Sequence, residues 1–329
     1  MTTHSDLKAV IRARQQKTGE SYTAARSHVL RRRDALIQDG SAGAPDANEP
    51  QRIEAAVLKV GAQSARIRIA GESGQVTFRS SDVWRIVPGH WVTLLVNRRW
   101  TWCGDDYASG DVEECRIDLP QLGLAPLPLE SGGLEDIREY SEPFRATDPY
   151  APLWRRLTKK PRPAFEFDGL TWGEFPGDSE DANPTCIAAE LMEEGAWAAA
   201  RDLLMDTLHR DLRCLDAHAH LGSLAFDHDL ERATAHYEIG TRIGASLLPE
   251  GFEGLLPWSR IYNRPFLRCQ HGFALCLWRA GRFPEAVKAF ERLLSLNPND
   301  NQGARFCWSA VRAGTEWATF AADDRDGSA

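Results

Sequence analysis

The C-terminal part of the chain repeats one helical pattern, and this repeat constrains the fold more than any other feature. The segment GRFPEAVKAFERLLSLNPND, residues 281–300, reads as a single helix with a proline in its first turn and Asn-Pro just after its end. Proline suits the first turn of a helix because its missing N–H is not needed there. Ala286 and Phe290 are four residues apart, so both face the side that packs against the preceding helix.

Two upstream segments share this pattern. EEGAWAAARDLLMDTLHRDL and DHDLERATAHYEIGTRIGA each carry a central alanine followed four residues later by a large side chain, Ala200 with Leu204 and Ala233 with Tyr237. Another segment of helical periodicity precedes each of them, so that each pair of segments forms one unit. The first two units share a 34-residue register, with one residue missing from the turn of the second unit. Helical hairpins that recur at a fixed period predict a solenoid. We therefore expect a helical-repeat domain over residues 184–320.

The pattern resembles the tetratricopeptide repeat, a family of stacked helical hairpins. The third unit matches the family's small, aromatic and closing positions at Ala274, Gly281, Phe283, Ala286, Phe290, Leu294 and Pro298. The second unit keeps Gly222, Ala233, Tyr237 and Gly240. The third unit departs from the family at Leu277, where tyrosine is usual, and at Leu293, where a small residue is usual. The chain is also similar to bacterial repeat proteins without an assigned role. The resemblance implies a protein-binding domain, but such repeats bind very different ligands, so it names no partner.

Residues 53–118 change to a period of two. Short segments rich in Val, Ile, Trp and Thr, separated by Gly, Ser and Asn, predict five or six strands. Short strands with tight turns favour a small antiparallel β-barrel. Around this barrel we expect a linker over 39–52, an irregular Pro/Gly-rich connector over 119–183 and a disordered tail over 321–329. Four aromatic residues of the connector are expected to rest on a neighbouring domain: Trp154, Phe165, Phe167 and Trp172.

The first 38 residues predict a basic helical hairpin. Residues 1–36 carry eight Lys and Arg residues against three acidic residues, whereas the whole chain has a net charge of −8. The rest of the chain is therefore acidic, with a net charge of −13. Three interpretations of the basic hairpin remain open: a solvated hairpin, docking on an acidic partner or on the chain's own acidic body, and binding to nucleic acid.

One insertion interrupts the repeat. The segment LPEGFEGLLPWSRIYNRPF, residues 248–266, separates the second and third units, where a short connection is usual. Rigid aromatic residues next to arginine are typical of binding hot spots. The insertion and the helix after it therefore predict a partner-binding site at Trp258, Tyr262, Asn263, Arg264 and Arg268. The alternative is that the insertion only covers the repeat core with its aromatic side chains.

The barrel offers a second candidate site. Basic and stacking residues on a small barrel suit single-stranded nucleic acid. The candidate residues are Arg66, Arg68, Arg98, Arg99, Trp100 and Trp102. Arg66 and Arg68 share a face of one strand because they are two residues apart. The alternative is a barrel core filled by tryptophan with a solvated polar face, and the acidic segment GDDYASGDVEE, residues 104–114, opposes phosphate binding.

The remaining chemistry-bearing residues form no recognisable motif. Four histidines near three aspartates, His218, His220, His228 and His236, have no metal-ligand spacing, so we interpret them as solvated or packing residues and expect no metal. Phosphate-binding and nucleophile motifs are not evident, so we expect no cofactor and assign no catalytic residue, and an enzymatic role is disfavoured. The seven cysteines are odd in number and scattered, which favours reduced thiols.

These features predict a multidomain α+β protein of the cytoplasm with no signal peptide and no membrane association. We expect it to act as a protein–protein interaction scaffold or adaptor whose repeat domain binds a protein or peptide partner. The alternative is a nucleic-acid-associated protein that binds through the barrel and the basic N-terminal helices.

Overall fold

The computed structural model describes residues 50–141, 144–172 and 183–326. The predicted N-terminal hairpin, residues 1–38, and most of the predicted linker lie outside these residues. Among the described helices, none has the length and apolar character that a membrane span needs. The residues from Pro50 onward belong to one compact unit that contains a β-barrel followed by helices.

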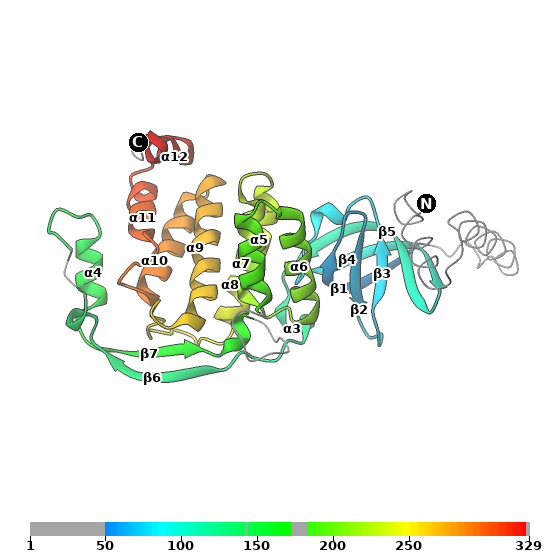
Figure 1. Ribbon diagram of the computed structural model, residues 1–329, viewed down its shortest axis with the longest axis horizontal. Helices are drawn as coiled ribbons and strands as arrows, with labels where there is room; N and C mark the ends of the chain where they lie inside the picture. Colours follow the sequence, from blue (N-terminus) through cyan, green and yellow to red (C-terminus); the bar gives the residue numbers. More distant parts are fainter. Residues whose placement is uncertain (1–49, 142–143, 173–182, 327–329) are drawn as a thin grey trace, which may run out of the picture. The chain divides into compact units, whose positions relative to one another are not determined.

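Five strands close into the barrel in the order β1-β2-β3-β5-β4 (Figure 1). They are β1 (Gln51–Val60), β2 (Ser64–Ile69), β3 (Val76–Arg79), β4 (Trp91–Trp102) and β5 (Asp105–Arg116), with a 3-10 turn η1 (Val83–Arg85) before β4. The barrel is not fully antiparallel as predicted, because β3 and β5 run parallel. A closed ring with an odd number of strands cannot alternate in direction throughout, so one parallel pair is unavoidable.

Aliphatic side chains and Phe78 fill the barrel interior. The interpretation of a core filled by tryptophan is therefore wrong for the described barrel. Trp91 packs outside the barrel in the same cluster as Leu204 and Leu208 of the first helices, and Trp84 and Trp102 are more than half exposed. The small interior of a five-stranded barrel is filled by Val, Ile and Ala, so the large indoles lie on its outer surface.

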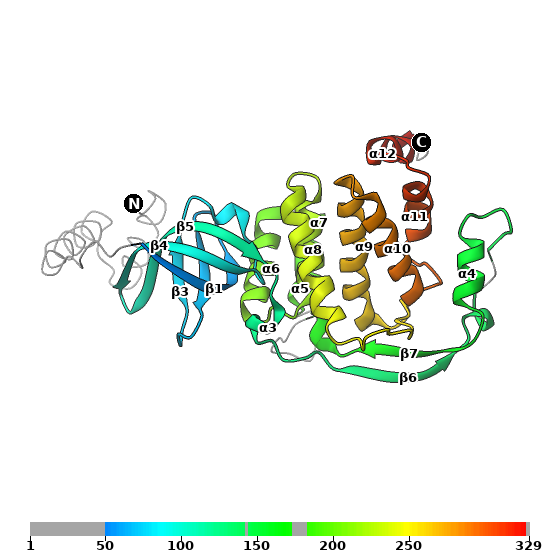
Figure 2. The same cartoon turned by 180° about the vertical axis from the view of Figure 1, so that it is seen from behind.

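The connector between the barrel and the repeat helices is more regular than predicted. It contains α3 (Leu119–Leu122), β6 (Leu129–Glu135), η2 (Ile137–Glu139), α4 (Ala151–Leu157), β7 (Arg162–Phe167) and η3 (Gly169–Trp172). The strands β6 and β7 pair antiparallel into a ribbon that runs along one end of the helices in both views (Figures 1 and 2). The proline and glycine residues of this segment did not indicate a ribbon in the sequence. Besides β6, β7 also pairs with the 248–266 insertion, which is distant in the chain. Phe165 N–H donates to the carbonyl of Leu255 at 2.9 Å, and Leu255 N–H donates to the carbonyl of Pro163 at 2.8 Å.

Eight helices follow in the described part of the chain: α5 (Pro184–Glu193), α6 (Trp197–Arg210), α7 (Leu215–Phe226), α8 (Leu230–Ala245), α9 (Arg264–Arg279), α10 (Phe283–Leu296), α11 (Ala304–Arg312) and α12 (Trp317–Asp326). From α5 to α11, consecutive helices pack side by side (Figure 1). Because α12 extends to Asp326, residues 321–326 continue a helix and are not the disordered tail that we predicted. Trp317 and Phe320 anchor α12 against Trp278, with ring centroids 5.2 and 4.9 Å from it.

Glycines allow the central helices to approach closely. A Cβ atom on Gly272 of α9 would lie 2.2 Å from the ring of Tyr237 on α8, and one on Gly222 of α7 would lie 2.7 Å from the same ring. Tyr237 therefore occupies space that any larger residue at these two positions would need. The barrel contacts this helical part through a turn in which Gly89 meets Ile239 of α8, and through an ion pair between Lys59 and Asp206.

Candidate functional site

Much of the 248–266 insertion is part of the core. Its apolar residues Phe252, Leu255, Leu256 and Phe266 are buried. Asn263, which we predicted to bind a partner, is also buried and holds the ribbon in place. Its side-chain oxygen accepts from Phe167 N–H at 3.0 Å, and its amide donates to the carbonyls of Phe165 and Pro257 at 2.9 and 3.1 Å. Asn263 is therefore a structural residue that a partner cannot reach.

Tyr262 belongs to the same structural junction. Its ring meets Trp172 edge-to-face at 5.6 Å, and its carbonyl accepts a hydrogen bond from Thr171 Oγ1 at 3.1 Å. The ring is only half-buried, so it borders the solvent face of the insertion. Tyr262 thus stabilises η3 and contributes at most the edge of a binding surface.

The remaining predicted residues form one cluster on this face. Two guanidinium groups lie over the half-buried indole of Trp258, with Arg264 5.4 Å and Arg268 5.8 Å from the ring. Arg264 and Arg268 share one side of α9 because they are four residues apart. Arg264 Nε also donates to the Trp258 carbonyl at 3.0 Å, which fixes the start of α9 against the insertion. We call Trp258, Arg264 and Arg268 the α9 cluster.

A carboxylate neutralises one of these two arginines. Asp216 on α7 is buried, and its carboxylate accepts a 2.7 Å hydrogen bond from Arg268 Nη1. His220 Nε2 lies 3.5 Å from the other carboxylate oxygen. Burial raises the pKa of Asp216, but hydrogen bonding by His220 and the charges of His220 and Arg268 lower it more, so the net pKa falls below its ordinary value. Asp216 therefore stays ionised and holds Arg268 in place.

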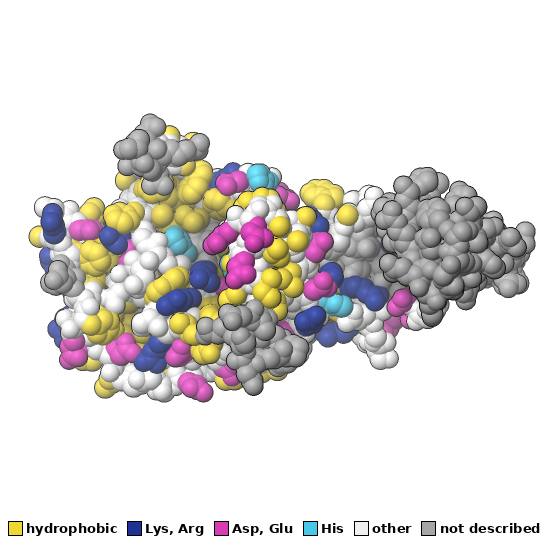
Figure 3. All heavy atoms as spheres, in the orientation of Figure 1, with side chains coloured by type: hydrophobic (Ala, Val, Ile, Leu, Met, Phe, Trp, Pro, Cys, Tyr) yellow, Lys and Arg dark blue, Asp and Glu magenta, His cyan; other side chains and the backbone are white. Residues whose placement is uncertain are grey.

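Arg264 differs from Arg268, because no acidic side chain among the described residues forms an ion pair with it. The space-filling view shows basic side chains next to hydrophobic ones over the beginning of α9 (Figure 3). An arginine stacked on an indole presents both a charged fork and an apolar surface. The α9 cluster is therefore suited to a ligand that has a carboxylate beside an apolar group.

The barrel candidate is a second exposed cluster. Trp100 of β4 stacks on Tyr107 of β5, with ring centroids 5.4 Å apart and planes within 11°. Arg79 of β3 lies 5.3 Å from the Tyr107 ring, and Arg98 lies 5.3 Å from the Trp100 ring. Trp102 meets Tyr107 edge-to-face at 6.4 Å. Tyr107 was absent from the predicted site, because the cross-strand pairing that brings it beside Trp100 is not visible in single segments.

The other predicted barrel arginines are engaged elsewhere. Arg99 forms a two-point ion pair with Glu72 at 2.8 and 2.7 Å, and Arg68 donates to the Leu122 carbonyl at 2.7 Å. Arg66 donates to Thr77 Oγ1 at 2.7 Å, and Thr77 pairs with Tyr107 across β3 and β5, so Arg66 borders the aromatic stack. Asp105 lies 3.8 Å from Arg66 and partly offsets its charge.

The four clustered histidines differ in burial: two are buried, His220 is half-buried and His228 is exposed. His218 and His236 are buried, with their Nδ1 atoms 3.4 Å apart, and His90 of the barrel is buried close to them. Burial lowers the pKa of His90 and of His218 to about 4 and that of His236 well below its ordinary value. Within the described ranges, no three His, Cys, Asp or Glu side chains converge in a way that could hold a metal ion.

Comparison of the chain with known protein families, with curated protein sequences and with solved protein structures finds no match.

Proposed function

We propose that the helical part of the chain is a protein-interaction domain that binds an acidic polypeptide segment at the α9 cluster. The observation that carries this proposal is that two guanidinium groups lie 5.4 and 5.8 Å from the ring of the Trp258 indole. Arg268 is paired with Asp216, whereas Arg264 pairs with no carboxylate of the described residues. An aromatic ring supplies contact area at low entropy cost, and the arginine fork binds a carboxylate through two hydrogen bonds.

The packing of the helices supports a repeat architecture of the tetratricopeptide kind. The repeated alanines Ala200, Ala233 and Ala286 are all completely buried. Their partners four residues later, Leu204, Tyr237 and Phe290, are buried as well. Helices of such repeats stack into extended surfaces that bind partner chains.

Selection from a random peptide library tests the proposal. Peptides enriched on the wild-type chain are expected to carry an excess of Asp and Glu and to lose binding to an Arg264→Ala variant. Enrichment of neutral or basic peptides that bind the variant equally well would contradict it.

A second candidate function rests on the barrel. Its strand order, with β3 parallel to β5, is that of the five-stranded Greek-key barrel known as the OB-fold, which binds oligonucleotides in many proteins. The Trp100–Tyr107 stack with Arg79 and Arg98 lies on the outer face of this barrel. Stacking surfaces flanked by arginine are how single strands are bound without sequence preference. We therefore infer a single-strand binding surface on the barrel as the alternative function.

A further inference from the structure

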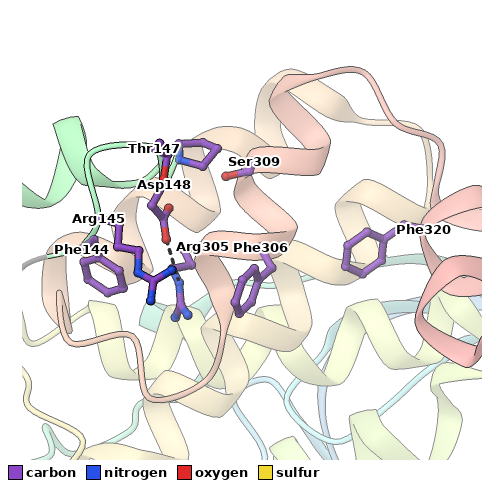
Figure 4. A pocket seen from close by; sticks show the side chains of 9 residues that line it. Phe144, Arg145, Thr147, Asp148, Arg305, Phe306, Ser309 and Phe320 are labelled. Atoms are coloured by element: carbon purple, nitrogen blue, oxygen red, sulfur yellow. Dashed lines mark ion pairs between the residues drawn. The ribbon is translucent and has the colours of Figure 1, made fainter. Parts of the chain in front are cut away.

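A cavity of about 610 Å³ opens where the segment before α4 meets α11 and α12 (Figure 4). Phe144 and Arg145 come from the connector, Arg305 and Phe306 from α11, and Phe320 from α12. These residues are far apart in the sequence, and sequence reasoning did not single out the cavity. We call it the α11 pocket.

Two of the apolar walls of the α11 pocket pack against buried aromatic side chains. Phe144 meets Tyr150 edge-to-face at 5.0 Å, and Phe320 contacts Trp278 at 4.9 Å. Phe306 is different, because 57% of it is exposed on the rim of the pocket. An exposed phenylalanine beside two fixed phenylalanine walls favours an apolar group as occupant.

The two arginines of the pocket differ in whether they are already paired with a carboxylate. Arg305 donates from Nη1 to Asp300 at 2.8 Å, and its Nε lies 3.8 Å from Asp148, as the dashed line in Figure 4 marks. Its guanidinium lies 4.0 Å from the Phe306 ring and 5.0 Å from the Phe144 ring. Arg305 is thus committed to the wall of the pocket.

Arg145 is exposed, and no carboxylate among the described residues pairs with it. Asp148 opposes an incoming anion, but it already accepts from Tyr150 N–H at 2.8 Å and faces Arg305. Arg145 is therefore the group that is available to an anion at the mouth of the pocket.

We propose that the α11 pocket captures the C-terminal residue of the polypeptide bound at the α9 cluster, with its side chain among the three phenylalanines and its carboxylate on Arg145. This inference rests on the proposed function. A C-terminal residue is the unit of a polypeptide that carries an apolar side chain and a full negative charge on the same carbon. The elements that carry the two sites are in contact, because Gln302 just before α11 donates to the Leu267 carbonyl of α9 at 3.4 Å. Trp258 N–H also donates to Asn297 Oδ1 at 3.4 Å, which joins the α9 cluster to the loop that leads into α11.

Ligand-observed NMR with small probes tests the pocket on the full chain. N-acetylphenylalanine is expected to bind, and its C-terminal amide is expected to bind about tenfold more weakly because it lacks the charge. Arg145→Gln and Phe306→Ala should each weaken binding of the free acid, whereas Arg155→Gln, at an exposed arginine of α4 outside the pocket, should leave it unchanged. Equal binding of acid and amide, or of wild type and Arg145→Gln, overturns the inference.

A second set of probes, short peptides, distinguishes the C-terminus of a polypeptide from a small free acid as the source of the carboxylate. Acetylated tetrapeptides that end in phenylalanine should bind more tightly than N-acetylphenylalanine, because a polypeptide can extend toward α9. Weaker binding of the longer probes would assign the pocket to a small free acid and would overturn the polypeptide terminus. Trp258→Ala should leave N-acetylphenylalanine binding intact. Binding of N-acetylphenylalanine thus tests the α11 pocket alone, whereas binding of the acidic library peptides tests the α9 cluster.

Discussion

The buried carboxylate of Asp216 on α7 is held by the guanidinium of Arg268 on α9 at 2.7 Å. This ion pair links α7 to α9 and gives the two arginines of the α9 cluster different roles. Arg268 serves the fold first, because its loss would leave the buried Asp216 without its arginine partner, with His220 and Thr185 still beside it. Arg264 forms no ion pair with a described carboxylate, so a substitution of Arg264 is the better test of binding.

We expect Arg268→Ala to lower the free energy of unfolding by about 1–2 kcal/mol. Removing one partner of a buried ion pair leaves an uncompensated charge, but Arg268 is 40% exposed, so solvent reduces the cost. Urea denaturation measures this difference. In a double-mutant cycle with Asp216→Asn, the two losses should not add. Additive losses would show that the two side chains do not interact.

Close packing around Tyr237 predicts that Gly272→Ala destabilises the helical part. The added Cβ would lie 2.2 Å from the ring, and overpacking of this kind costs about 1–3 kcal/mol. The higher helix propensity of alanine returns about 1 kcal/mol, so the net loss should be small but measurable by thermal unfolding. In a Tyr237→Ala background the same change should stabilise the protein. A loss of equal size in both backgrounds would contradict the contact.

The barrel surface predicts salt-dependent binding of a single strand. Trp100→Ala should weaken binding of an oligothymidylate of about 12 nucleotides by about 1–3 kcal/mol, because a stacking surface is lost. Arg79→Ala should weaken it and also reduce its dependence on salt. Trp84→Ala, at an exposed tryptophan of η1, is the matched control and should change little. Fluorescence anisotropy at low salt is the measurement, and undetectable binding by the wild type would remove this candidate function.

The buried histidines predict that stability falls in acid. In the unfolded chain these imidazoles take up protons near their ordinary pKa of 6.5, whereas His90 and His218 stay neutral in the fold down to about pH 4. The unfolded state binds more protons between these values, so the free energy of unfolding decreases as the pH falls from about 6.5 to 4. Each of the two contributes up to about 3 kcal/mol over that interval.

A variant at His236 sharpens this pH test. Within the described part of the chain, the buried His236 Nε2 has no hydrogen-bond partner, and the charged or titratable groups that face this histidine are His218, His90 and Arg232. We expect His236→Leu to retain stability at pH 7.5 within about 1 kcal/mol and to lose part of the acid dependence. His228→Gln, at an exposed position, should keep the wild-type dependence. An unchanged slope in His236→Leu would show that this histidine takes no part.

Local patterns in the sequence predicted the C-terminal helices and the barrel strands, whereas pairing between distant segments determined the other features. The spacing of Ala286 and Phe290 was enough to predict one buried helix face, and both residues are buried. The ribbon of β6 and β7 was missed, because the bond between Phe165 and Leu255 joins segments that are distant in the chain. The position of the indoles was also missed, because the alternation of β4 shifts at a bulge between Val96 and Arg98.

The candidate site shows the same division. Trp258 and Arg264 were recognisable from composition, since aromatic residues and arginine in an unusual insertion indicate a binding surface. Asn263 was wrongly included, because its side chain bonds to the backbone of β7, a strand that the sequence did not reveal. The α11 pocket combines the connector with the last two helices, so no local motif could indicate it.

The dissociation constant of an acidic library peptide, measured for the wild type and for an Arg264→Ala, Trp258→Ala double variant, tests the central claim most directly. Thermal unfolding of both proteins accompanies it, so that a loss of fold is separated from a loss of contact. We predict that the double variant stays folded and binds the peptide at least about tenfold more weakly, the effect of losing about 1.4 kcal/mol at a hot spot. A folded double variant with the wild-type dissociation constant would contradict the assignment of the α9 cluster as the binding site.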